Sequence, residues 1–173
     1  MPFYPGPGLG GHCIPIDPFY LSYKAKEFGL IARFIELSGE INTQMPNLVV
    51  SNLTKAMNDN LKKPLNGSKV LIIGIAYKKD IDDMRESPAL KIAELLSFKG
   101  ANISYHDPNI NDAKELKFVE LNKESLGKAD AVVITTDHSN VDYEMVGKYA
   151  RLIIDTRNVM AGVKNPKADV LRA

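Results

Sequence analysis

The stretch Lys69–Ala76 reads KVLIIGIA, a continuous apolar run after one lysine. A strand that is covered on both faces has no solvent side, so its sequence is apolar throughout instead of alternating. The segment before it, KPLNGS at residues 63–68, is rich in turn-forming residues. We therefore predict a buried strand over residues 69–76 and a domain boundary just before it.

Strand and helix patterns alternate after this run. Ser87-Pro88 is a favourable helix start, because serine caps a helix and proline suits its first turn, and Gly100 is a favourable stop. A shorter helix is predicted over residues 142–149, and further strands at residues 102–106, 131–135 and 152–155. Such alternation implies parallel βαβ units. The predicted fold class is therefore α/β, with a Rossmann-like doubly wound parallel sheet.

The chain before the boundary has a different pattern. Residues 1–16 are rich in glycine and proline and are predicted to form a loop, and apolar residues then recur at helical spacing up to about residue 62. The signals within this helical segment are Asp17-Pro18 as a start, Gly39 as a break and Pro46 as the start of a second helix. The predicted domains are a helical part at residues 1–64 and an α/β part at residues 65–173.

Composition narrows the class of protein. Hydrophobic residues make up 45% of the 173 residues, enough for a sizeable core, and the formal net charge is +1. Neither sign of charge runs in blocks, which argues against nucleic acid or a membrane surface as the main partner. One cysteine excludes an internal disulfide and suits a reducing compartment. With neither a stretch of about 18 apolar residues nor a signal-like start, the predicted location is cytoplasmic.

Charged side chains follow two of the predicted strands, at the edge where sheets of this type bind ligands. Lys78 follows the first strand and Arg157 the last. These cations could bind an anion such as a diphosphate, or they could be solvated loop residues, and position alone leaves both interpretations open. Only Gly74 follows the first strand, so no GxGxxG turn marks this sheet as a dinucleotide-binding unit.

The histidines and a group of acidic residues give weaker signals. His106 and His138 are interpreted as surface residues at strand ends, and the acidic cluster Asp80–Asp83 as a solvated turn. His12 beside Cys13 is not a convincing catalytic pair, since neighbours in sequence usually point apart. No other Cys or His has the spacing of metal ligands, so no metal site is predicted.

The only cysteine lies in a loop of glycines and prolines, PGPGLGGHCIPIDP at residues 5–18. A thiolate is the reactive form of cysteine, and the positive end of a nearby helix lowers the pKa of a thiol. Glycines let a ligand approach the backbone closely, and Asp17 could position a water or exchange protons there. Against this, a lone cysteine is most often a small buried hydrophobe, and such a loop is often only a turn. The residues alone leave the choice open.

Four motifs, taken in order, resemble one family. They are GPGLGGHCIPIDP at residues 6–18, GIAYK at 74–78, DMRESPA at 83–89 and DTRN at 155–158. Together they resemble the UDP-glucose/GDP-mannose dehydrogenases, and the resemblance covers essentially the whole chain. The version HCIPIDP is most similar to UDP-N-acetylglucosamine and UDP-N-acetylmannosamine 6-dehydrogenases, since members that act on UDP-glucose usually carry a lysine in place of Ile16.

The resemblance implies an NAD-dependent, four-electron oxidation of a sugar C6 alcohol to a uronic acid, for polysaccharide precursor synthesis. Cys13 matches the nucleophile that forms a thiohemiacetal and then a thioester. Asp17 matches the aspartate that assists proton transfer and thioester hydrolysis. The remaining matches are substrate contacts at Tyr4, Gly6, Gly8, Gly10, Lys78 and Arg157, and NAD contacts at Cys13 and Arg85.

The resemblance also implies that this chain is a C-terminal portion. Family members carry an N-terminal NAD domain with GxGxxG, which also holds a catalytic lysine and asparagine, so the chain alone is expected to be inactive. Residues 1–64 would hold the cysteine loop and helices of the central dimerisation domain, and residues 65–173 the domain that binds a UDP-N-acetylhexosamine or UDP-hexose. A homodimer through the central helices is expected. Two alternatives stay open, a non-catalytic UDP-sugar-binding or dimerisation module and a cysteine enzyme that works without NAD.

Overall fold

Six parallel strands form the centre of the structure. The computed structural model describes residues 4–173, and its sheet has the strand order β3-β2-β1-β4-β5-β6. The strands are β1 Lys69–Ile73, β2 Asn102–His106, β3 Lys117–Phe118, β4 Ala131–Ile134, β5 Leu152–Asp155 and β6 Asp169–Arg172. Every neighbouring pair is parallel. The predicted α/β class with a doubly wound sheet is confirmed, and the strand order reverses between β1 and β4.

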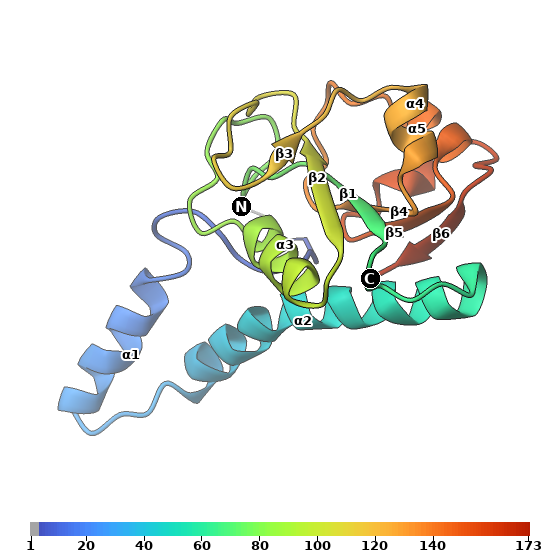
Figure 1. Ribbon diagram of the computed structural model, residues 1–173. Coiled ribbons are helices and arrows are strands. Elements are labelled where there is room, and N and C mark those ends of the chain that lie inside the picture. The colour runs from blue at the N-terminus through green and yellow to red at the C-terminus, as the bar shows by residue number, and fades with distance from the viewer. Residues whose placement is uncertain (1–3) are drawn as a thin grey trace.

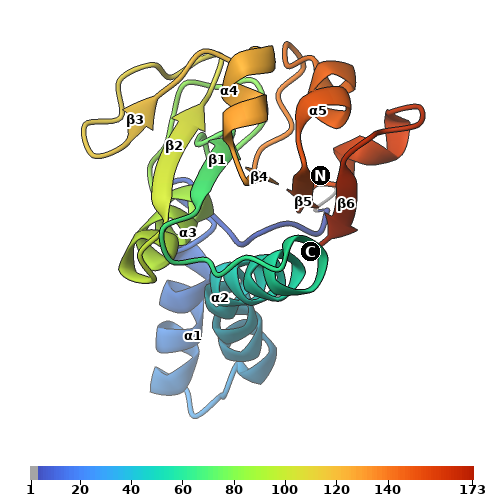
Figure 2. The same ribbon diagram turned by 45° about the vertical axis from the view of Figure 1, so that its right-hand side comes forward.

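Helices cover both faces of this sheet (Figures 1 and 2). One face carries α3, Pro88–Phe98, and the second half of α2, Arg33–Leu61; the other carries α4, Lys123–Lys128, α5, Tyr143–Tyr149, and the 3-10 helix η1, Val159–Gly162. Each face has its own buried apolar cluster, and β1 contributes Val70 and Ile72 to one and Leu71 and Ile73 to the other. Successive residues of a strand point to opposite faces, so a strand between two cores must be apolar at every position.

β1 is shorter than predicted. It ends at Ile73 and not at Ala76, because Gly74 turns the chain with a φ of 82°. A Cβ at residue 74 would lie 2.6 Å from the carbonyl oxygen of Thr136, so the glycine closes a packed turn. The strands predicted at residues 102–106 and 152–155 have those bounds, and β4 ends one residue earlier than predicted.

The two predicted helices of the α/β part are present, with side-chain caps at their starts. The hydroxyl of Ser87 accepts a hydrogen bond from the Ala89 N–H at 3.3 Å, and Pro88 is the first residue of α3. Gly100 follows the helix with a φ of 83°. α5 is capped by Asp142, whose carboxylate accepts from the Met145 N–H at 2.9 Å.

The helical part is divided differently from the prediction. α1 spans Asp17–Glu27 and α2 begins at Arg33, so the break lies at residues 28–32 and not at Gly39. Gly39 lies inside α2, where a Cβ would clash with the ring of Phe19, so it is the point of close approach between the two helices. Pro46 also lies inside α2 and starts no helix. The helix continues through it because the next turns pack Val49, Val50 and Leu53 into the core.

Four elements were not predicted, namely β3, α4, η1 and β6. β3 has two residues, and β3 and β6 are the two edges of the sheet, each paired on one side only. An edge strand needs no continuous apolar run, so its signal in sequence is weak. α1 and the first turns of α2 project away from the sheet as an arm (Figure 1). Among the described residues, no helix is long and apolar enough to cross a membrane.

Candidate functional site

The glycine-rich loop at residues 4–16, here called the cysteine loop, lies against the carboxyl edge of the sheet. Gly6 faces the guanidinium group of Arg157, which follows β5, and a Cβ at residue 6 would clash with it. A Cβ at Gly10 would lie 2.6 Å from Cβ of Tyr77, which follows β1. The Gly11 N–H donates a hydrogen bond to the Arg85 carbonyl at 3.0 Å. The cysteine loop and the strand ends were predicted as separate features, and the structure places them in contact.

Arg157 is a partly buried cation without an anionic partner. Its Nε donates to the Thr135 carbonyl at 3.0 Å, and its backbone N–H donates to the buried Asp155 carboxylate at 3.0 Å. Burial lowers the pKa of Arg157, while the charge of Asp137 raises it. An arginine nevertheless stays protonated in proteins. Within residues 4–173 its guanidinium forms no ion pair, so the group remains available to an anion.

Lys78 and Lys79 are adjacent but have different surroundings. The ammonium of Lys79 lies 3.8 Å from the Asp137 carboxylate. Lys78 is exposed and forms no ion pair within the part of the chain that the structure describes. The turn that carries both lysines is fixed at its start, where the Tyr77 N–H donates to the Asp83 carbonyl at 3.0 Å. Lys78 and Arg157 thus follow β1 and β5 at one edge of the sheet, and neither forms an ion pair with another described residue.

Cys13 is an exposed thiol. The interpretation of this cysteine as a small buried hydrophobic residue, which the sequence alone left open, is therefore wrong. Its Sγ lies 3.9 Å from Nδ1 of His12, and its carbonyl accepts from the N–H groups of Ile16 at 3.0 Å and Asp17 at 2.8 Å. These bonds fold the loop into the start of α1. The N-cap is Ile16, without a side-chain hydrogen bond, and Asp17 is the first helical residue, so α1 begins one residue earlier than predicted, where Asp17 was expected as the cap.

The other predicted site residues lie around this loop. Tyr4 is exposed at its start, and Gly8, with a φ of 136°, packs against Pro88. Arg85 is exposed, and its Nη2 lies 2.6 Å from Asp83 Oδ2. That ion pair lowers the pKa of Asp83 and raises the pKa of Arg85. A cavity of about 600 Å³ runs between the loop, α2 and α3, with Gly8, Pro15, Asn42 and Ser87 in its lining.

Two polar residues at this edge were misjudged or missed in the sequence. His138 was interpreted as a surface residue, but it is fully buried and its Nε2 lies 3.1 Å from the carboxylate of Asp107, itself buried. Asp107 was missed, although the Asp107-Pro108 pair directly after β2 was a signal available in the sequence. Asp80, from the cluster interpreted as a solvated turn, is exposed as predicted, and both of its oxygens also accept hydrogen bonds from Ser139.

The hydroxyl of Tyr143 is buried near the same edge and has no hydrogen-bond partner among the described residues. Burial raises the pKa of Tyr143, and the negative charges of Asp137 and Asp155 raise it further.

No group of three or more His, Cys, Asp or Glu side chains within residues 4–173 is placed to hold a metal ion.

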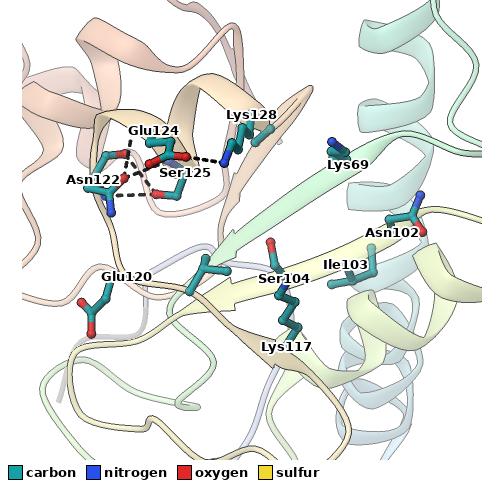
Figure 3. Close-up of a pocket in the computed structure, with 12 residues that line it drawn as sticks. Lys69, Asn102, Ile103, Ser104, Lys117, Glu120, Asn122, Glu124, Ser125 and Lys128 are labelled. Carbon is teal, nitrogen blue, oxygen red and sulfur yellow. Dashed lines mark hydrogen bonds and ion pairs between the residues drawn. The ribbon is translucent and has the colours of Figure 1, made fainter.

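A second cavity, of about 500 Å³, lies elsewhere, over β2 and β3 beside α4 (Figure 3). Its lining includes Lys69, Asn102, Ser104, Lys117, Asn122 and Lys128. None of its lining residues belongs to the cysteine loop or to the loop that carries Lys78. It is therefore separate from the candidate site, which is the surface formed by the cysteine loop, Lys78 and Arg157.

Comparisons with known proteins give a consistent result. The model for the UDP-glucose/GDP-mannose dehydrogenase family, UDP binding domain, matches residues 71–162, and the model for the family's central domain matches residues 1–44. A UDP-N-acetyl-D-mannosamine dehydrogenase of Methanococcus vannielii is 36% identical over 169 residues, covering 90% of this chain and 36% of the relative. An Escherichia coli enzyme of the same name is 35% identical over 143 residues, covering 78% of this chain and 33% of the relative.

A solved structure of UDP-D-ManNAc dehydrogenase from Pyrococcus horikoshii superimposes with a TM-score of 0.81 at 30% identity, covering 98% of this chain and 40% of that one. The chain thus spans about 36% of the length of the first curated relatives that it matches.

Proposed function

This chain belongs to the UDP-glucose/GDP-mannose dehydrogenase family, and we propose that it forms the UDP-sugar-binding and cysteine-bearing part of an NAD-dependent 6-dehydrogenase. The resemblance inferred from the four motifs is confirmed at the level of the family. The proposed substrate is a UDP-N-acetylhexosamine, because the Methanococcus vannielii and Escherichia coli relatives are named UDP-N-acetyl-D-mannosamine dehydrogenases and because Ile16 replaces the lysine expected for UDP-glucose. The uronate product would enter polysaccharide precursor synthesis.

One observation carries the proposal: the cysteine loop packs on Arg157, which forms no ion pair with any other residue that the structure describes. Gly6 lies against the Arg157 guanidinium, and Gly10 packs on Tyr77, the residue before Lys78 in the loop after β1. A diphosphate offers several charged oxygens that a planar guanidinium and a lysine ammonium can bind together. A UDP held by these two cations would place its sugar along the backbone of residues 6–10, whose glycines pack closely on Arg157, Pro88 and Tyr77. The sugar would then extend toward Cys13.

Cys13 and Asp17 would perform the chemistry in this arrangement. The C6 alcohol loses a hydride and a proton to become an aldehyde, and the Cys13 thiolate then adds to the aldehyde carbon to form a thiohemiacetal. Loss of a second hydride and proton from C6 gives a thioester, which water hydrolyses to the carboxylate and free Cys13. Asp17 exchanges protons with the sulfur adduct and orients the hydrolytic water. The exposed position of Cys13 at the start of α1 supports this role.

NAD⁺, when bound, supplies the hydride acceptor for both oxidation steps. The described residues fit only one part of a cofactor site. Arg85 is an exposed cation whose backbone holds the cysteine loop through Gly11, and a cofactor phosphate beside Cys13 would share its guanidinium with Asp83, to which it is ion-paired at 2.6 Å. The turn after β1 does not fit a dinucleotide, because Gly74 packs directly on Thr136. We therefore assign to this chain contacts of Arg85 and Cys13 with the cofactor and no dinucleotide turn.

The arm formed by α1 and the start of α2 is proposed as the dimer interface. It exposes large apolar side chains, among them Tyr20, Tyr23, Phe28, Ile31, Phe34 and Ile41. Such a patch is costly in water and marks a contact surface, which supports a homodimer. The proposed division into a central part at residues 1–64 and a UDP-sugar-binding part at residues 65–173 assigns this arm to the former. The same patch also suits the alternative of a non-catalytic dimerisation module, and the reaction itself is assigned to the cytoplasm, where Cys13 stays reduced.

Calorimetric titration of the chain with UDP tests the site. We expect saturable binding that weakens at least tenfold in Arg157→Ala and in Lys78→Ala, because each removes a charge-assisted contact to phosphate. Lys79→Ala is the matched control, since its ammonium is already paired with Asp137, and it should bind UDP like the wild type. Equal losses in both lysine variants, or no UDP binding by the folded chain, would contradict the assignment.

A further inference from the structure

A buried imidazole joins three loops at the carboxyl edge of the sheet. His138 follows β4 and has a fully buried side chain. Its Nε2 lies 3.1 Å from Oδ2 of Asp107, which follows β2. Its Nδ1 accepts a hydrogen bond from the backbone N–H of Asp80, in the loop after β1, at 3.0 Å. A single side chain therefore connects the ends of the three strands β2, β4 and β1, although these are far apart in sequence.

The hydrogen bonds fix the protonation of this imidazole. A backbone N–H can only donate, so Nδ1 must be the bare, accepting nitrogen. The side-chain amide of Asn109, 3.1 Å away, reaches the same nitrogen. Nε2 then carries the proton, and its N–H donates a hydrogen bond to the Asp107 carboxylate. Only the neutral tautomer with the proton on Nε2 satisfies both ends, so His138 serves as a rigid connector with one donor and one acceptor.

Asp107 is a firm anchor for this connector. Its Oδ2 also accepts from the N–H groups of Ile75 at 2.7 Å and Ala76 at 3.1 Å, and its Oδ1 accepts from Asn109 at 2.9 Å and Ile110 at 3.2 Å. Burial disfavours the charged form, but the bonds from His138 and the backbone outweigh it and lower the pKa of Asp107. The carboxylate is thus charged and fully bonded at neutral pH.

At the other end, the connector holds Asp80 in an unusual backbone conformation. Asp80 has a φ of 58°, in the left-handed region that residues with a side chain seldom adopt and that Asp tolerates better than most. Three bonds hold this conformation: the one to His138, and those from the backbone and the hydroxyl of Ser139, both at 2.7 Å. Strain that is held by several bonds is typical of functional loops. Lys78 lies two residues before this fixed point.

We infer that His138 is a positioning residue for the nucleotide site: through the Asp80 N–H it fixes the turn of residues 77–80 and thereby aims the Lys78 ammonium at the substrate's diphosphate. This inference rests on the proposed function, because it takes the diphosphate contact of Lys78 as given. The hydrogen bonds of His138 fix the backbone that carries Lys78, whereas the lysine side chain has no bond that would fix its own direction. Lys78 is exposed and forms no ion pair within residues 4–173, so its direction depends on the backbone that carries it.

Two substitutions separate the ends of the connector. In His138→Asn, the amide oxygen takes the place of Nδ1 and can still accept from Asp80, but the bond to Asp107 is lost. In His138→Gln, the amide nitrogen takes the place of Nε2 and can still donate to Asp107, but the bond from Asp80 is lost. We expect UDP affinity to fall about three- to tenfold in His138→Gln, the equivalent of one lost hydrogen bond. His138→Asn should bind UDP within about twofold of the wild type, even if it unfolds more easily.

A double-mutant cycle shows whether the effect passes through Lys78. In a Lys78→Ala background, His138→Gln should cause no further loss of UDP affinity, because no ammonium remains to be aimed. A role in general stability would instead give losses that add, and UDP affinity would follow the urea midpoint across both variants. His106→Asn is the matched control. This histidine is the last residue of β2, at the same edge of the sheet, but its side chain bonds to the Val119 carbonyl and not to residues 77–80.

Ser139→Ala covers the case in which a histidine variant does not fold, because it removes one bond to Asp80 from an exposed position. It should weaken UDP binding about two- to fivefold, also only when Lys78 is present. Amide hydrogen exchange without ligand supplies a readout that does not need UDP: exchange at Asp80 should speed up in His138→Gln and not in His138→Asn. If the wild type binds no UDP, the proposed function fails, whereas unchanged exchange at Asp80 or additive losses would overturn this inference alone.

Discussion

The buried carboxylate of Asp107 provides the sharpest prediction for stability, and the perturbation is Asp107→Asn. The substitution keeps the shape of the side chain but replaces one accepting oxygen with a donating NH₂. Both oxygens face only donors. At the Oδ2 position the new amide would face Ile75, Ala76 and His138, and at the Oδ1 position it would face the N–H groups of Asn109 and Ile110.

Placing the NH₂ at the Oδ1 position costs less, because it loses two hydrogen bonds instead of three. The NH₂ then faces the N–H groups of Asn109 and Ile110, which are donors themselves. Hydrogen bonds to a charged group contribute roughly 1.5–3 kcal/mol each, so the free energy of unfolding should fall by about 3–6 kcal/mol. That is a large share of the ~5–15 kcal/mol that a domain typically has. Urea unfolding followed by circular dichroism at pH 7 measures it. Asp112→Asn, at an exposed aspartate in the same loop, is the control and should change stability by less than about 0.5 kcal/mol.

The pH dependence follows from the lowered pKa of Asp107. A carboxyl whose pKa is lower in the folded state stabilises the protein fully above its unfolded pKa of about 3.9, and this contribution is lost as the pH falls through the folded pKa. The gap in stability between wild type and Asp107→Asn should therefore narrow as the pH is lowered below about 4. A loss under 1 kcal/mol at pH 7, or a gap that stays constant down to the acid transition, would refute the reasoning.

Three further predictions test other parts of the structure. Gly6→Val should abolish detectable UDP binding in calorimetry while leaving the urea midpoint in place, because a side chain there displaces the Arg157 guanidinium; intact binding would contradict the loop contact. Tyr143→Phe should raise the free energy of unfolding by about 1 kcal/mol, since it removes a buried hydroxyl without a partner among the described residues, and a destabilised variant would show that the hydroxyl is bonded. Phe34→Glu, at a side chain 87% exposed on the arm, should shift the chain from dimer to monomer in analytical ultracentrifugation, and a wild type that is already monomeric would refute this interface.

The sequence predicted best where the chain is buried on both sides. The strands at residues 102–106 and 152–155 have the predicted bounds, and the apolar run at 69–73 places β1 between two cores. It failed where a tertiary contact decided the local structure. Gly39 and Pro46 are helix breakers by propensity, yet both lie inside α2, because one allows Phe19 to approach and the other is followed by turns anchored in the core.

At the candidate site, too, the residue types could be predicted from the sequence, whereas the contacts between distant residues could not. Cys13, Lys78 and Arg157 were identified as candidates from their types and positions, but no local pattern could show that Gly6 lies against Arg157. His138 was misjudged for a related reason. A histidine after a strand is usually solvated, and only the folded arrangement places the Asp107 carboxylate and the Asp80 N–H at its two nitrogens.

The contacts at this edge also differ in kind, and the difference bears on how the site would work. The turn that carries Lys78 is held by the bond of Asp80 to His138, which is itself anchored on the buried Asp107 carboxylate, and by the bonds between Asp80 and Ser139. The cysteine loop is held by close glycine packing and by one backbone bond, from Gly11 to Arg85. Few buried contacts and an exposed backbone are the features of a segment that opens at low cost. The cations would therefore form a rigid anion site, while the loop with Cys13 keeps the freedom to close over a bound sugar. Substitutions in the network should then change UDP affinity first, and substitutions at Gly10 or Gly11 should change the reactivity of Cys13 first.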